Sequence, residues 1–294
     1  MKCFHHNDMD GYCSAAIVAA ETKDYNQDDY IEIDYVTPIP VHKINEGETV
    51  YFVDYSFSGT NINALKEILN RNCNLIWIDH HKTSIALLDR YPEFKSIPGI
   101  VREGESGALL TYKFFHKSEI EKCLDIPHPI ELVSDYDCWQ FKYGDETTFF
   151  KLGVDSEDSS PLSSFWYDVI YDGQQSGKRM EQTIKNGRLL NNYVDEQNTW
   201  YRNHYGFISE INGIPCFALN LKTNSWVFGK AYDDYPLCVA FAYNGERYVY
   251  TLYSSKSDID CAAIAGLFGG GGHAGAAGFS TETLILNKFK ETAT

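Results

Sequence analysis

The residues best suited to chemistry lie at the end of one apolar run in the first third of the chain. Residues 75–78 are all apolar, and Asp79, His80 and His81 follow them directly. Such a run is typical of a strand that is buried on both faces of a parallel sheet. The acid and the two histidines would then lie at the edge where open α/β sheets bind ligands. Strands without a function also end in such residues, so the stretch indicates a site only if it has suitable neighbours.

Two further groups of acids offer such neighbours. His6, Asp8 and Asp10 alternate near the start of the chain, and Asp54 directly follows a β-forming run over 49–53. Alternate residues of an extended segment project to one side, so the first three side chains can share a ligand. Nitrogen and oxygen donors suit a divalent metal. The alternative is a capped helix start, because Asp and Asn are favoured at N-caps.

The elements between these acids predict a parallel sheet. A short apolar-leaning strand is expected before His6, and helical patterns over 12–21 and 62–69 separate it from the runs over 49–53 and 75–78, giving the order strand–helix–strand–helix–strand. This order implies parallel strands joined by crossover helices. The acids that follow the strands should therefore gather along one edge. A fourth strand is expected over 97–101 and a further helix over 108–116.

One more predicted helix carries two acids. It begins near Pro127 and Pro129, residues typical of a helix start, and it contains Asp135 and Asp137. Bulky neighbours such as Tyr136 indicate that at least one of the two carboxylates is buried. A buried carboxylate needs a partner, and a metal ion can serve as one.

Together these groups resemble the four successive motifs of the DHH phosphoesterases. The motifs are His-Asn-Asp-Met-Asp-Gly over 6–11, Asp54, Asp79-His80-His81 and Asp135, in matching order and spacing over about the first 140 residues. The forms of the first and fourth motifs are most similar to the oligoribonuclease (nanoRNase) branch. The resemblance implies a two-metal site, in which one ion is held by His6, Asp8 and Asp54, and the other by Asp10, Asp54, His80 and Asp135, with Asp137 as the alternative to Asp135.

The same resemblance implies the catalytic roles. Asp54 would bridge two ions, Asp79 would orient His80 or His81, and His81 would contact the scissile phosphate. The catalytic group is thus Asp54, Asp79 and His81. Mixed imidazole and carboxylate ligands favour two Mn²⁺ ions, with Mg²⁺ or Co²⁺ as alternatives.

The second half of the chain predicts a linker and a smaller domain. A polar break near 155–161 precedes a long helix over 177–201, and β patterns resume at 206 with a hairpin signal at Asn244-Gly245. The predicted class is α/β, with a doubly wound parallel-sheet domain over 1–150, a helical linker over 151–205 and a smaller α/β domain over 206–294.

A glycine-rich stretch near the end is the second candidate site. After a helix expected over 260–268, four glycines (269–272) and His273 expose backbone N–H groups that can bind an anion. The alternative is a flexible linker, but the alanines that follow are expected to begin a helix, which a linker would not need.

This stretch resembles the DHH-associated C-terminal domain, which implies substrate binding by Gly270, Gly271, Gly272 and His273. Many relatives carry an arginine where this chain has Ser254. Lys256 or Arg247 would then supply the positive charge.

Composition narrows the function further. The net charge of −16 disfavours long duplex nucleic acid, whose capture relies on Lys and Arg. No apolar run is long enough for a transmembrane helix, the first residues lack the apolar core of a signal peptide, and the eight cysteines form no CxxC pair. We therefore expect a cytoplasmic protein that has no membrane partner. Its aromatic residues leave formation of a homodimer open.

The leading hypothesis is a Mn²⁺-dependent 3′–5′ exonuclease that acts on short RNA oligonucleotides or linear dinucleotides. The alternatives are a cyclic-dinucleotide phosphodiesterase, a phosphatase for a bisphosphorylated nucleotide, and a non-catalytic nucleotide sensor.

Overall fold

A computed structural model describes residues 1–57, 61–120 and 125–286. The chain divides into two compact units, an N-terminal unit (Met1–Asn191) and a C-terminal unit (Asn192–Thr294). The division falls inside the helix that the sequence predicts as a linker, and the domain limits 1–150, 151–205 and 206–294 stay a prediction. Residues 287–294 of the last predicted domain lie outside the described residues.

The N-terminal unit is built on a five-stranded sheet in which every described pairing is parallel. The strands are β1 (Lys2–His6), β2 (Tyr30–Ile33), β3 (Thr49–Val53), β4 (Asn74–Asp79) and β5 (Gly99–Val101), in the order β2-β1-β3-β4-β5. The chain moves outward from β1 to β2 and then returns to the other side of β1 to form β3. The order therefore reverses between β1 and β3, which is where open α/β sheets form a ligand crevice.

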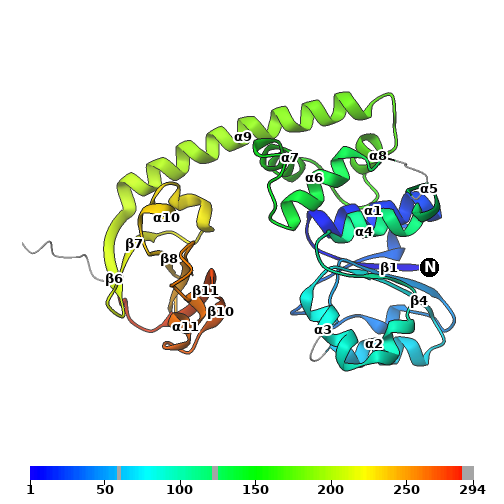
Figure 1. The fold of residues 1–294 in the computed structure, drawn as a ribbon, viewed down its shortest axis with the longest axis horizontal. Coiled ribbons are helices and arrows are strands. Elements are labelled where there is room, and N and C mark those ends of the chain that lie inside the picture. Colours follow the sequence, from blue (N-terminus) through cyan, green and yellow to red (C-terminus); the bar gives the residue numbers. More distant parts are fainter. Residues whose placement is uncertain (58–60, 121–124, 287–294) are drawn as a thin grey trace, which may run out of the picture. The chain divides into compact units, whose positions relative to one another are not determined.

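Helices cover both faces of this sheet, with α1 and α4 on one face and α2 and α3 on the other (Figure 1). The helices of the N-terminal unit are α1 (Met9–Thr22), α2 (Ile62–Asn70), α3 (Lys82–Arg90), α4 (Gly107–Phe115), α5 (Lys117–Ile120), α6 (His128–Asp137), α7 (Asp145–Asp155), α8 (Ser164–Ile170) and the first part of α9 (Ser176–Tyr205). The predicted doubly wound α/β class is confirmed.

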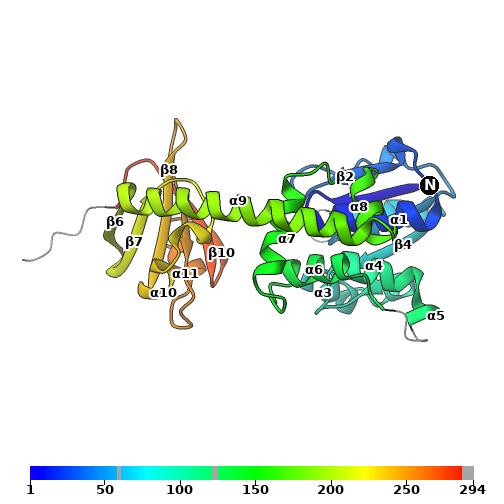
Figure 2. The same cartoon turned by 90° about the horizontal axis from the view of Figure 1, so that it is seen from above.

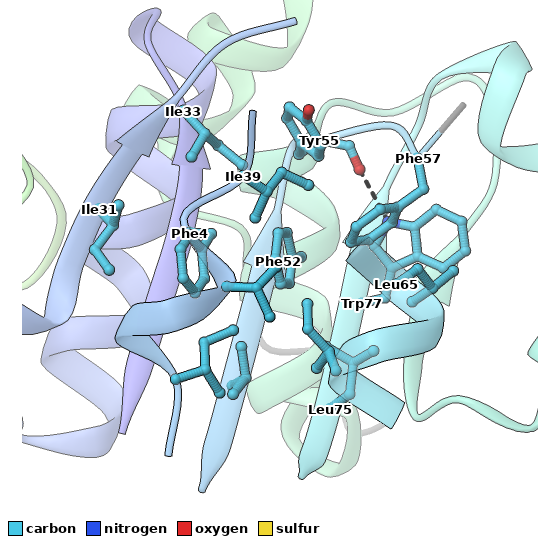
Figure 3. Close-up of a cluster of buried hydrophobic side chains, with 14 of the residues drawn as sticks. Phe4, Ile31, Ile33, Ile39, Phe52, Tyr55, Phe57, Leu65, Leu75 and Trp77 are labelled. Atoms are coloured by element: carbon cyan, nitrogen blue, oxygen red, sulfur yellow. Dashed lines mark hydrogen bonds between the residues drawn. The ribbon is translucent and has the colours of Figure 1, made fainter. Parts of the chain in front are cut away.

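The alternation of side chains along the strands explains this double cover. Phe4, Phe52 and Trp77 enter one apolar cluster, whereas their strand neighbours Val53 and Ile78 enter another on the opposite face. The rings of Phe4 and Phe52 stack 4.7 Å apart (Figure 3). Because apolar residues occupy both faces, the centre of the sheet is buried and only its strand ends can carry polar chemistry.

The C-terminal unit contains a six-stranded sheet in the order β10-β11-β9-β8-β7-β6. The strands are β6 (Gly206–Ile211), β7 (Ile214–Asn220), β8 (Leu237–Tyr243), β9 (Tyr248–Tyr253), β10 (Gly271–His273) and β11 (Ala276–Thr281), and the short helices are α10 (Ala231–Asp234) and α11 (Cys261–Gly266). All pairs are antiparallel except β7 with β8. The predicted hairpin at Asn244-Gly245 joins β8 to β9, and α9 is unbroken in both views (Figures 1 and 2).

Two local predictions were wrong. Strand β2 was not expected, because only four residues with a short alternating pattern signal it. The alanines after the glycine stretch do not begin a helix. They form β11, which pairs with β9 and β10 and buries Ala277 and Phe279, so cross-strand packing outweighs the helix propensity of alanine. Among the described residues, no helix is both long and apolar enough to cross a membrane.

Candidate metal centre

The carboxyl ends of β1, β3 and β4 bring the predicted acids and histidines together. His6 ends β1, Asp54 follows β3, and Asp79 ends β4 immediately before His80 and His81. Parallel strands end at the same edge, and the reversal of strand order between β1 and β3 opens the crevice there. The sequence prediction of one shared edge therefore agrees with the structure.

His6 and Asp8 form one side of the group. The Asp8 carboxylate accepts from Gly11 N at 2.9 Å and so caps α1, while its other oxygen lies 2.7 Å from His6 Nδ1. The hydrogen bond to Asp8 raises the pKa of His6. Asp8 thus caps the helix and also belongs to the polar cluster, so the two interpretations of this motif are compatible.

Asp54 lies at the centre of the group and is 1% exposed. Its backbone has a positive φ of 53°, and its N–H donates to Ile78 O. Neither carboxylate oxygen accepts a hydrogen bond among the described residues. Burial, followed by the charges of Asp10 and Asp8, raises the pKa of Asp54 well above its ordinary value. An unpartnered buried carboxylate is costly, and a cation is the partner that would satisfy it.

His80, which directly follows β4, contacts three of the carboxylates. Its Nε2 lies 3.2 Å from Asp54 Oδ1, 3.2 Å from Asp137 Oδ2 and 3.8 Å from Asp10 Oδ2. Burial lowers the pKa of His80, but hydrogen bonding to Cys138 and the charges of Asp10 and Asp137 outweigh burial and raise it to about 9. Without a metal, a protonated imidazole is therefore the cation that holds these carboxylates together.

Asp10 is fixed by the start of α4. Its two carboxylate oxygens accept from Gly107 N at 2.6 Å and from Ala108 N at 2.8 Å. A Cβ on Gly107 would lie 2.6 Å from Asp54 Cβ and 3.0 Å from Asp10 Oδ2, so only glycine allows this close approach. The sequence prediction missed Gly107, and the only local signal is the Gly-Glu-Ser-Gly segment before the helix.

Asp79 and His81 form a second hydrogen-bonded pair. Asp79 is fully buried, its Oδ1 lies 2.7 Å from His81 Nδ1, and its Oδ2 accepts from the hydroxyl of Ser84. The His81 side chain is 34% exposed, so the ring reaches solvent while its Nδ1 is held. Asp79 is therefore placed to orient His81, whereas His80 lies against Asp54 and Asp137.

The structure separates the two acids of α6. Asp135, preferred in the sequence prediction, accepts from Lys142 N at 2.8 Å, from Tyr143 N at 3.2 Å and from the hydroxyl of Thr147. Asp137 instead lies beside His80, and its Oδ2 has no hydrogen-bond partner among the described residues. Burial and Asp10 raise the pKa of Asp137 to about 7. The geometry therefore favours the alternative, Asp137, as the acid of this segment that faces the cluster.

The cluster has the donors of a metal site. Three sets of side chains each place one donor atom per residue within 4.8 Å of the others: His6, Asp8 and Asp54; Asp54, Asp79, His80 and His81; and His80, Asp137 and Cys138. The Asp54 oxygens and Asp137 Oδ2 accept no hydrogen bond among the described residues, and the His80 imidazole lies 3.2 Å from Asp54 Oδ1 and from Asp137 Oδ2. A divalent cation would complete this arrangement of acceptors. The residues present thus fit a metal centre.

The predicted substrate residues of the C-terminal unit do not all lie together, in contrast to the predicted metal ligands of the N-terminal unit. Gly271, Gly272 and His273 form β10, and His273 is exposed at the turn into β11. Lys256 follows β9 at the same end of the sheet and donates from Nζ to Asp233 O at 2.7 Å. Arg247 precedes β9 at its other end, about 20 Å away along the strand, and contacts Ser280 and Glu282. The structure therefore does not bring Arg247 to the glycine stretch.

Glycine is sterically required within that stretch. A Cβ on Gly270 would lie 2.2 Å from Gly278 O, and one on Gly272 would lie 2.6 Å from Ala277 Cα. Close packing of β10 on β11 therefore accounts for these two glycines, whereas Gly271 has open space around it.

Comparison with known proteins agrees with this geometry. Residues 3–132 match the family described as "DHH family, N-terminal domain". The chain carries a DHH family domain. The matched DHH segment contains every strand of the N-terminal sheet and the whole strand-end cluster except Asp137 and Cys138.

Two curated relatives are similar to this chain. Oligoribonuclease NrnB of Bacillus subtilis is 23% identical, over 97% of this chain and 74% of its own length. An uncharacterized protein of Acanthamoeba polyphaga mimivirus is 25% identical, over 79% of this chain and 53% of its own length. The chain thus spans about half the length of the viral relative.

The solved structure of a pGpG-specific phosphodiesterase, PggH of Vibrio cholerae, shares the fold. Its TM-score is 0.53 at 14% identity, over 96% of this chain and 94% of the other. The similarity of fold therefore covers residues of both units of the chain.

Proposed function

We propose that this DHH protein is a divalent-metal-dependent phosphodiesterase that hydrolyses short oligoribonucleotides or linear dinucleotides. The observation that carries the proposal is Asp54, a buried carboxylate whose two oxygens accept no hydrogen bond among the described residues and which shares one donor group with His6 and Asp8 and contacts His80. A carboxylate with both oxygens available between two ligand sets suits a bridge between two cations, and paired cations suit in-line displacement at phosphorus.

The proposed ligands fall into two sets around Asp54. His6, Asp8 and Asp54 would hold one ion, and Asp10, Asp54, His80 and Asp137 the other, with Asp137 in the place that the sequence prediction gave to Asp135. Bound divalent ions supply Lewis-acid polarisation of the phosphate and lower the pKa of a coordinated water. The mixture of imidazole and carboxylate donors favours Mn²⁺.

The protein's own contribution is orientation. Asp79 holds His81 by its Nδ1, which leaves the opposite nitrogen of the partly exposed ring as the one proposed to contact a phosphate oxygen. The Gly107 and Ala108 amides hold Asp10, so the carboxylate is placed before substrate arrives. Both contacts reduce the rearrangement that the transition state requires.

A cavity of about 310 Å³ beside the cluster supports a nucleotide substrate. Asp8, Asp10 and Asp137 line one part of it, and Tyr136 and Lys151 line another. The aromatic ring offers a stacking surface for a base, and the lysine offers a cation for a phosphate beyond the metal centre. A site of this size with one lysine suits a short substrate better than a long strand, which agrees with the net charge of −16.

In the C-terminal unit, His273 and Gly271 remain the proposed substrate contacts, with Lys256 as the nearby cation. His273 is exposed, and Gly271 is the member of the stretch whose surroundings are open. Packing does not explain the glycine at position 271, so approach of a ligand to the backbone is the proposed reason for it.

The test is a Mn²⁺-dependent assay on linear dinucleotides, RNA of two to about ten nucleotides, cyclic dinucleotides and a bisphosphorylated nucleotide. Asp54→Asn should abolish hydrolysis, whereas Asp89→Asn, a matched change at an exposed acid paired with Lys95, should not. Labels at the 5′ or the 3′ end of the RNA would give the direction of cleavage, for which we propose 3′ to 5′. Absence of turnover on every substrate would refute the enzyme proposal and favour a sensor.

A further inference from the structure

Cys138 joins the candidate metal centre through a contact that the proposed function does not use. It follows Asp137 at the carboxyl end of α6, and its sulfur, an Asp137 oxygen and a His80 nitrogen lie within 4.8 Å of one another. The thiol is half-buried. Sulfur, nitrogen and oxygen donors therefore converge at one side of the centre.

The same histidine also contacts Asp54, a buried carboxylate of the neighbouring donor groups. Asp54 is 1% exposed, its oxygens lack hydrogen-bond partners, and its Oδ1 lies 3.2 Å from the same His80 Nε2. The converging imidazole, carboxylate and thiol are donor types that Zn²⁺ takes, and three protein ligands with an open fourth position are an established zinc arrangement. Hard cations such as Mg²⁺ and Mn²⁺ prefer oxygen and gain little from a thiolate.

We propose that His80, Asp137 and Cys138 form a Zn²⁺-selective site that shares His80 and Asp137 with the proposed catalytic centre, so that zinc occupies it in competition with the catalytic ion. The thiol releases its proton to solvent as the sulfur–zinc bond forms. The intrinsic order of affinities already favours Zn²⁺ over Mn²⁺, and a thiolate ligand widens that difference. Binding of zinc is independent of the proposed function; only the resulting inhibition rests on it.

Cobalt substitution tests the sulfur ligand directly. The full-length protein loaded with Co²⁺ should show the near-ultraviolet sulfur-to-cobalt charge-transfer band, and Cys138→Ser and Cys138→Ala should each lose it. Cys73→Ser is the matched control, because this partly exposed thiol lies at the N-terminal end of β4 and bonds to Asn45 O, so the band should persist. A band that survives in both Cys138 variants, or that is absent from the unmodified protein, overturns the proposal.

Competition with a colorimetric chelator measures the selectivity. Zn²⁺ affinity should fall at least ~10-fold in Cys138→Ser, since loss of even an outer-shell partner costs that much. The ratio of Mn²⁺ affinity to Zn²⁺ affinity should rise by the same factor, and an unchanged ratio contradicts the selectivity.

The assay of hydrolysis separates the two proposals. In the unmodified protein, micromolar zinc should inhibit Mn²⁺-dependent turnover, and Cys138→Ser should need correspondingly more zinc for the same fractional inhibition. If the protein hydrolyses substrate in an Asp54-dependent way but shows no cobalt–thiolate band, the zinc site is refuted and the proposed function stands. If it shows the band but hydrolyses no substrate, the zinc site stands and the proposed function is refuted.

Discussion

Replacing Asp54 with Asn should stabilise the metal-free protein while removing its response to metal. The Asp54 oxygen lies within 4.8 Å of donor oxygens of Asp8 and Asp79, which at an effective dielectric constant of about 20 corresponds to a repulsion of at least about 3.5 kcal/mol from each. The contact at 3.2 Å with protonated His80 returns about 5 kcal/mol on the same scale. The ionised carboxylate is therefore unfavourable by about 2 kcal/mol, before the cost of its burial is added.

Asparagine has the same shape without the charge, and its amide can donate to a neighbouring carboxylate. We expect the free energy of unfolding of the metal-free variant to rise by about 2 kcal/mol, which for a unit of this size corresponds to a Tm higher by about 4–8 °C. Unmodified protein should gain about 2.7 kcal/mol from Mn²⁺ at 100 times its Kd, and the variant should gain none.

The assay is thermal unfolding, followed by circular dichroism, with a chelator and with added Mn²⁺. Calorimetric titration on the same samples would report metal affinity independently of stability. A lower Tm for the metal-free variant would show that Asp54 is satisfied by contacts within the protein and would refute the electrostatic argument. A variant that retains Mn²⁺ affinity would refute the bridging role.

Three further predictions concern neighbouring residues. Asp137→Asn should remove most of the stabilisation by Mn²⁺. Asp135→Asn should keep that stabilisation but lower the free energy of unfolding by about 1–3 kcal/mol, because it weakens a buried acceptor of three hydrogen bonds. The opposite pattern in Mn²⁺ titrations would return the ligand role to Asp135. Gly107→Ala should reduce turnover at least tenfold with little change in the far-ultraviolet spectrum, because its Cβ would displace Asp10 and Asp54; unchanged kcat would show that the site tolerates this shift. The metal-free protein, kept in chelator, should lose stability as pH rises from about 4 to about 7. Across that window Asp137, whose pKa is raised to about 7, keeps a proton in the folded state that it loses in the unfolded state. Chemical denaturation should therefore show a free energy of unfolding that falls with pH, and Asp137→Asn should make this fall less steep.

The main positions of the site could be predicted because they depend on local order along the chain. An apolar run followed at once by an acid places that acid at a strand end, and the alternation of strands and helices makes those ends share an edge. Asp54 and the Asp79–His81 segment required nothing more than this. The family resemblance then supplied the roles that spacing alone does not give.

The remaining features depend on contacts that local sequence does not record. Asp135 and Asp137 are two residues apart on a helix, about 200° around its axis, so they must face different directions, but the sequence does not say which direction meets the metal centre. Gly107 matters because Asp10 and Asp54, far away along the chain, approach it. Arg247 and Lys256 both lie near Ser254 in the sequence, yet β9 separates Arg247 from the glycine stretch.

The positive φ of Asp54 limits which experiments can be interpreted at this position. The left-handed region costs most residues about 1–2 kcal/mol, and Asn and Asp tolerate it best among residues that carry a side chain. An alanine at position 54 would therefore combine a backbone penalty with the loss of a carboxylate, and a glutamate would add the same penalty while keeping the charge. Loss of activity in either variant would confound main-chain strain with ligand chemistry. Of these substitutions, only asparagine removes the carboxylate charge without adding backbone strain. The same constraint limits the residues that a functional homologue could carry at this position to those that accept a positive φ.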